Sequence, residues 1–121
     1  MEAEIEDKKE TVREKSEKFA IRIVNLYKYL ISEKNEYVMS KQILRSGTSI
    51  GANLAEADYA ISKSDFLSKL YISLKETSET PYWLRLLFRT DYISEKEYSS
   101  LYDDGEEIRK ILSSSTKTLK Q

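Results

Sequence analysis

The sequence contains no cysteine and no histidine, and these two absences remove several kinds of chemistry. Without cysteine, the chain of 121 residues can form no disulfide and no thiolate metal site. Without histidine, it lacks the commonest general base and the commonest metal ligand. Its serines also have no histidine or cysteine companion for nucleophilic catalysis. We therefore predict that the protein is not an enzyme and that it needs no cofactor and no metal.

Turn-forming residues and net charge are scarce as well. Three glycines and one proline are too few for an all-β or loop-rich fold, so the composition favours helices. Twenty basic and twenty-one acidic residues give a net charge of −1, without the basic excess typical of nucleic-acid-binding domains. The sequence has no apolar run of the ~20 residues that a membrane span needs. Because its first residues also lack the pattern of a signal peptide, we expect a cytoplasmic protein with no membrane partner.

Apolar residues recur with helical spacing in four segments of the chain. The predicted helices cover residues 6–32, residues 38–60, a segment from residues 62–65 to residue 89, and a segment that follows the capping box Ser94-x-x-Glu97. Because the connections are short, helices adjacent in sequence must run antiparallel. The pattern predicts an all-α, antiparallel up-and-down four-helix bundle. We expect one domain over residues 1–121, frayed over about ten N-terminal and about eight C-terminal residues.

The second predicted helix contains Gly47 and Gly51, each of which costs roughly 1 kcal/mol relative to alanine in a helix interior. Their presence indicates that another part of the structure approaches closely. Together with Ala52 and Ala55 they form a small-residue face, which is a candidate oligomer interface; the same face would also suit tight packing inside one bundle. In the third helix, Pro81 either produces a kink or starts a new helix. We favour the kink, because the apolar stripe continues in phase across the proline.

Polar stripes border the buried faces of the second and third helices. We predict that they meet in a structural polar network formed by Arg45, Ser49, Asn53, Glu56, Ser73, Glu76 and Glu79. Arg45 would pair with Glu76 or Glu79, and the other members would satisfy buried polar groups. The alternative is an all-oxygen Mg²⁺ or Mn²⁺ site at Glu56, Glu76 and Glu79. Since partly buried polar groups generally need partners, we favour the structural interpretation.

Basic residues supply candidate contacts with nucleic acid at Lys15, Lys18, Arg22, Arg85 and Arg89. Tyrosine and tryptophan side chains near them in the sequence offer rings on which unpaired bases stack. The alternative is that these charges only solvate the surface, because acidic residues are interleaved with those of the first helix, and that the tyrosines pack at the edges of apolar stripes. We favour the second interpretation.

The sequence over residues 42–56, QILRSGTSIGANLAE, resembles the signature of a small bacterial four-helix-bundle family. The founding members of this family are encoded in intervening sequences within large-subunit ribosomal RNA genes, and accessory proteins of diversity-generating retroelements look like relatives. The similarity continues through Ser64-x-Phe66 and residues 70–84, and spans about residues 19–112. It implies a ring-like homopentamer, with RNA, DNA or a reverse transcriptase as partner. It implies no catalytic activity.

Three functional hypotheses follow from these observations. The first is a non-enzymatic homo-oligomeric scaffold that binds structured RNA or DNA. The second is an adaptor for a protein partner, without affinity for nucleic acid. The third, which we favour least, is a metal-dependent enzyme that uses the carboxylates named above. The sequence alone leaves the identity of the partner open.

Overall fold

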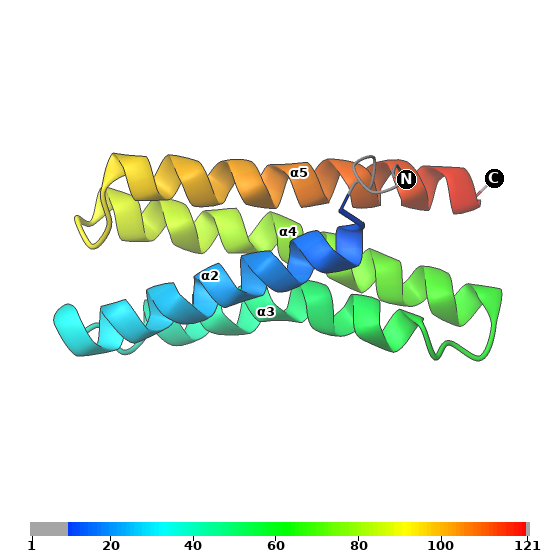
Figure 1. Ribbon diagram of the computed structural model, residues 1–121, viewed down its shortest axis with the longest axis horizontal. Helices are drawn as coiled ribbons and strands as arrows, with labels where there is room; N and C mark the ends of the chain where they lie inside the picture. Colours follow the sequence, from blue (N-terminus) through cyan, green and yellow to red (C-terminus); the bar gives the residue numbers. More distant parts are fainter. Residues whose placement is uncertain (1–9, 121) are drawn as a thin grey trace, which may run out of the picture.

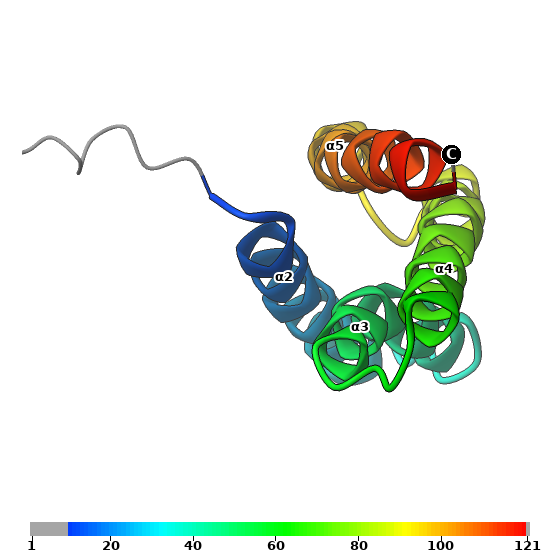
Figure 2. The same cartoon turned by 90° about the vertical axis from the view of Figure 1, so that its right-hand side faces the viewer.

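A computed structural model describes residues 10–120, and over this range the chain forms four antiparallel helices (Figure 1). These are α2 (Val12–Glu33), α3 (Met39–Ala57), α4 (Lys63–Arg89) and α5 (Glu95–Lys120). Seen end-on, they follow one another around the bundle in sequence order, and the α2–α5 pair makes the fewest contacts of the neighbouring pairs (Figure 2). The predicted all-α four-helix bundle is thus confirmed. None of these helices is long and apolar enough to cross a membrane.

The core consists of aliphatic side chains and one phenylalanine, contributed by all four helices. Its fully buried members are Phe19, Ile23, Leu30, Ile43, Ile50, Leu54, Leu84, Leu87, Leu101, Ile108 and Leu112, each with at most 2% of its surface exposed. Burial of such a side chain stabilises a fold by roughly 1.5–3 kcal/mol. Tertiary packing of these apolar stripes, more than intrinsic helix propensity, therefore holds the bundle together.

Side-chain caps fix the N-termini of α2 and α5. The Thr11 hydroxyl accepts a hydrogen bond from the Glu14 amide at 3.1 Å, and the Glu14 carboxylate accepts one from the Thr11 amide at 2.9 Å. At α5, the Ser94 hydroxyl accepts from the Glu97 amide at 3.1 Å, as the capping-box sequence predicts. Asn35, just beyond α2, has the positive φ of 52° expected of a left-handed residue at a helix end. The predicted start of the first helix at residue 6 lies outside the described residues.

A glutamate caps α3 in a way that the sequence did not reveal. Both carboxylate oxygens of Glu36 accept from backbone amides, at 2.7 Å from Ser40 and 2.9 Å from Met39. Only 8% of Glu36 is exposed. This negative charge lies at the positive end of the α3 dipole, so it satisfies free amides and stabilises the helix start.

One predicted helix end was wrong. α3 ends at Ala57 and not near residue 60, because the amides of Asp58 and Ala60 bond to carbonyls three residues back, at 3.3 and 3.1 Å. Ile61, whose apolar side chain continues the helical spacing of the second predicted helix, is 92% exposed in the connection to α4. The C-terminal segment expected to fray is helical to Lys120, because Thr116 is buried and apolar contacts hold this last part of α5.

Helix α4 continues through Pro81 without interruption, so the alternative of a new helix starting there is wrong. The proline has no N–H to donate to the Thr77 carbonyl. Beyond it, Leu84 and Leu87 are fully buried, as the in-phase apolar stripe requires. Immediately before the proline, Thr80 Oγ1 lies 2.9 Å from the Glu76 carbonyl oxygen of its own helix.

Candidate functional site

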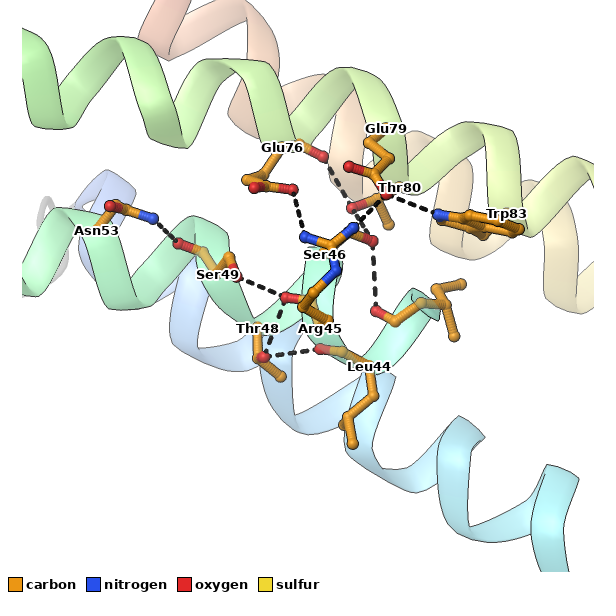
Figure 3. A network of polar contacts seen from close by, with 11 residues as sticks. Leu44, Arg45, Ser46, Thr48, Ser49, Asn53, Glu76, Glu79, Thr80 and Trp83 are labelled. Carbon is orange, nitrogen blue, oxygen red and sulfur yellow. Dashed lines mark hydrogen bonds and ion pairs between the residues drawn. The ribbon is translucent and has the colours of Figure 1, made fainter. Parts of the chain in front are cut away.

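The polar stripes of α3 and α4 face each other, and Arg45 connects them (Figure 3). One guanidinium nitrogen lies 3.5 Å from Glu76 Oε1, and another pairs with Glu79 Oε2. Trp83 Nε1 donates to the same Glu79 oxygen at 2.9 Å. Glu76 is only 7% exposed, and its Oε1 makes no hydrogen bond with a described residue. Arg45 therefore supplies the charge that compensates a nearly buried carboxylate.

Buried hydroxyl groups extend this α3–α4 contact. Ser73 Oγ donates across to the Ile50 carbonyl at 2.8 Å, and Thr80 Oγ1 donates to Ser46 Oγ at 3.1 Å. Sequence reasoning missed the role of Ser46, although a polar residue four positions before Ile50 on a buried face was an available signal.

The remaining predicted members of the network on α3 differ in the contacts that they make. Near the C-terminus of α3, Glu56 pairs with Lys69 of α4 at 2.9 Å, and this hydrogen bond raises the pKa of Lys69. Ser49 and Asn53 do not bond to α4. Ser49 Oγ donates to the Arg45 carbonyl at 2.6 Å, and Asn53 Nδ2 donates to the Ser49 carbonyl at 2.8 Å, both within α3. Five of the seven predicted residues thus join the helices, and two bond only within their own helix.

Each carboxylate proposed for the metal site has a cationic partner. Glu56 pairs with Lys69, whereas Glu76 and Glu79 pair with Arg45. Within residues 10–120, no three acidic side chains are grouped so that they would hold a metal ion. The metal-dependent alternative therefore lacks the ligand cluster that it requires in this part of the chain.

The three basic candidates on α2 all lie against carboxylates. Lys15 Nζ is 2.8 Å from Glu107 of α5, and Arg22 Nη1 is 2.7 Å from Asp104 of α5. Lys18 pairs with Glu10. The hydrogen bond from Lys18 lowers the pKa of Glu10, and the one to Glu107 raises the pKa of Lys15. These pairs neutralise much of the positive charge that this helix would offer to a phosphate backbone.

The C-terminal half of α4 presents basic residues of a different kind. The Arg85 guanidinium lies over the Tyr82 ring, 5.9 Å from its centroid, and Tyr82 is 46% exposed. Arg89 is exposed in the last turn of the helix. No carboxylate of residues 10–120 forms an ion pair with either arginine. At this candidate surface, positive charge and an aromatic ring are accessible together.

The small-residue face of α3 is divided between the interior and the surface. Gly47 is buried, and a Cβ atom there would lie 2.8 Å from Ile23 Cγ1, so this glycine serves packing between α2 and α3. Gly51 also faces α2, where a Cβ would meet ordinary contacts at 3.5 Å and beyond. Ala52 and Ala55 are exposed. They line a shallow groove with Gly51 and with residues that include Arg13, whose Nε donates to Asp58 at 3.1 Å.

Comparison with known proteins supports one family. The family model described as 23S rRNA-intervening sequence protein matches residues 8–114. A crystal structure of a protein of unknown function from the S23 ribosomal protein family of Bacteroides thetaiotaomicron superposes with a TM-score of 0.87. It is 59% identical to this chain, and the match covers 88% of this chain and 99% of that chain. A search of curated proteins finds no match.

Proposed function

The chain belongs to the 23S rRNA-intervening sequence protein family, and from this premise we propose that it is a non-enzymatic, homo-oligomeric scaffold that binds structured RNA. The observation that carries the proposal is the exposed Ala52–Ala55 groove on the outside of α3. Its small side chains leave room for a helix of a second subunit to approach closely. The resemblance of the sequence to its family implies that five subunits close a ring, each as a single cytoplasmic domain.

The RNA-binding part of the proposal is supported by the C-terminal half of α4. Arg85 and Arg89 provide positive charge for phosphates, and the exposed Tyr82 ring provides a stacking surface. The net charge of −1 means that attraction depends on this local surface and not on the whole molecule. In a ring, the same patch is repeated in every subunit, so several weak contacts act together on one RNA.

The solution mass tests the scaffold. By size-exclusion chromatography with light scattering, we expect about five times the chain mass of 14.1 kDa. The double variant Ala52→Glu/Ala55→Glu places like charges in the groove and should reduce the mass to that of a smaller species. Ser99→Glu/Ser100→Glu, on the exposed face of α5, is the matched control and should leave the mass unchanged. A monomeric wild-type protein would overturn the scaffold.

A titration with structured RNA tests the second part. Because phosphate contacts release counterions, binding should weaken steeply between two salt concentrations. Arg85→Ala/Arg89→Ala should weaken binding and flatten that salt dependence. Lys117→Ala/Lys120→Ala removes two basic residues from the end of α5 and is the charge-matched control, expected to change binding little. Absence of salt-dependent binding to RNA or DNA would count against this part of the proposal.

A protein-partner adaptor is the second candidate, and one specific observation favours it. Tyr59 and Ile61, in the connection between α3 and α4, are 86% and 92% exposed. Large side chains of this kind often anchor protein interfaces. The salt titration distinguishes the two candidates, because an apolar protein contact depends little on ionic strength. A reverse transcriptase would be one such partner, as the resemblance to retroelement accessory proteins implies.

A further inference from the structure

A pocket of about 380 Å³ opens between α2 and the start of α5. Its residues on α2 are Arg22, Asn25, Leu26 and Tyr29, which recur with helical spacing, and Ile93, Ser94 and Glu97 complete it from the other side. Leu26 and Ile93 are 4% and 8% exposed and provide an apolar surface within it. The volume lies in the range of small-ligand sites in proteins. Neither the polar network nor the proposed oligomer interface uses this pocket.

The side chains around the pocket differ in how far they are already engaged. Arg22 is held by Asp104 at 2.7 Å, and the Ser94 hydroxyl is used as the α5 cap. By contrast, the Asn25 amide and the Glu97 carboxylate make no hydrogen bond through their side chains to any residue between 10 and 120, and both are exposed. Tyr29 is 42% exposed, and Lys34 Nζ lies 5.9 Å from its ring centroid.

The side chains around the pocket indicate the chemistry that its ligand must have. An aromatic ring and two aliphatic side chains suit a flat ring system, on which Tyr29 can stack. A carboxylate accepts hydrogen bonds only, so Glu97 requires N–H donors, and two adjacent donors would occupy both of its oxygens. The Asn25 amide can both donate and accept, and Lys34 offers a cation beside the ring for a phosphate.

We propose that this pocket binds an unpaired guanine base, either in a free guanine nucleotide or in a single-stranded part of an RNA. Guanine presents N1–H and the N2 amino group side by side on its Watson–Crick edge, matching the two oxygens of Glu97. Its O6 is an acceptor for the Asn25 amide. Adenine and cytosine each offer a single amino group there, so the carboxylate discriminates against both bases.

The free-nucleotide arm uses calorimetric titration of the full chain with GMP, IMP and AMP. IMP lacks the N2 amino group, so we expect about tenfold weaker binding than GMP, the loss typical of a hydrogen bond to a charged group. AMP should bind at least as weakly as IMP. Glu97→Gln should weaken GMP binding about tenfold and IMP binding less, because the glutamine carbonyl still accepts from N1–H, and Tyr29→Ala should weaken both.

Tyr71→Ala is the matched control. Tyr71, on α4, is similarly exposed, at 40%, but it does not line the pocket. This variant should bind GMP like the wild type. The altered side chains are exposed, and circular dichroism melting of each variant verifies that the fold is retained. GMP binding that is insensitive to both pocket variants would overturn the proposal.

The RNA arm, which alone rests on the proposed function, compares two hairpins that differ only in one unpaired loop residue, G or A. Preference for G that Glu97→Gln abolishes supports the pocket with RNA as its ligand. GMP binding without such a preference supports the pocket with a free nucleotide as its ligand. RNA binding unaffected by Glu97→Gln, in a protein that ignores GMP, refutes the pocket and leaves the proposed function intact. If neither GMP nor any RNA binds, both proposals fail.

Discussion

Replacing Arg45 by alanine tests whether the α3–α4 polar contact stabilises the bundle. The variant leaves the carboxylate of Glu76 without a cation, and the side chain of Glu76 is only 10% exposed, whereas that of Arg45 is 48% exposed. Loss of one partner from a fully buried pair costs about 3–5 kcal/mol, and an exposed pair is worth at most about 1 kcal/mol. For this half-exposed case we expect a loss of about 1.5 kcal/mol, or about 5 °C in Tm.

A double-mutant cycle separates the ion pair from the loss of side-chain packing. Urea unfolding is measured for the wild type, Arg45→Ala, Glu76→Gln and the double variant, at one protein concentration because assembly shifts apparent stability. If the buried charge is responsible, Arg45→Ala should cost about 1 kcal/mol less in the Glu76→Gln background.

The control for this cycle is Arg13→Ala. The Arg13–Asp58 pair is exposed on both sides, at 41% and 48%, so its loss should cost no more than about 0.5 kcal/mol. Equal costs of Arg45→Ala in both backgrounds would show that the reasoning about Glu76 is wrong. So would an effect no larger than that of Arg13→Ala.

Other substitutions probe the packing, the α3 cap and the effect of acid. Gly47→Ala should destabilise by about 1 kcal/mol in urea unfolding, because overpacking outweighs the gain in helix propensity. Gly105→Ala should stabilise by about 0.5 kcal/mol, because its Cβ would find its nearest neighbour at 3.6 Å; the opposite order would contradict this account of the two glycines. Glu36→Ala should lower stability by about 1–2 kcal/mol through loss of the cap, and an unchanged Tm would argue against that role. The hydrogen bond from Arg109 lowers the pKa of Glu106 below its ordinary 4.5. This ion pair therefore stabilises the fold fully above about pH 4.5, and its effect is lost as the pH falls through the lowered pKa. In thermal melts, Glu106→Gln should reduce stability by a few tenths of a kcal/mol at pH 7 and by nothing at pH 2.

Much of the architecture follows from local features of the sequence. Apolar residues three and four apart place Phe19 and Ile23 on one face of a helix whatever lies opposite, so the core is predictable from spacing. The Ser94 cap and the left-handed Asn35 also depend on a few neighbouring residues. Ile61 shows the limit of this approach, because its position in the stripe is helical but its backbone lies beyond the end of α3.

The candidate site was predictable only in part. Spacing placed Arg45 and Glu76 at the borders of buried faces, and their pairing required only that α3 and α4 be neighbours. The spacing could not show that Ser49 bonds within its own helix. Its hydroxyl reaches a carbonyl of α3 before it reaches α4. The role of Glu36 was hidden for a different reason, since its carboxylate folds forward onto amides of the next helix.

The sequence by itself therefore determined the four helices, their apolar faces and the absence of thiol and imidazole chemistry, because each depends on composition or on residues within a few positions. Only the tertiary structure decided which side chains meet across helices. Lys15 pairs with Glu107 although 92 positions separate them, and Gly47 is required by Ile23 on a different helix. Helical period fixes the face on which a residue lies. The relative shift and crossing of packed helices fix its neighbour, and these depend on the whole core at once.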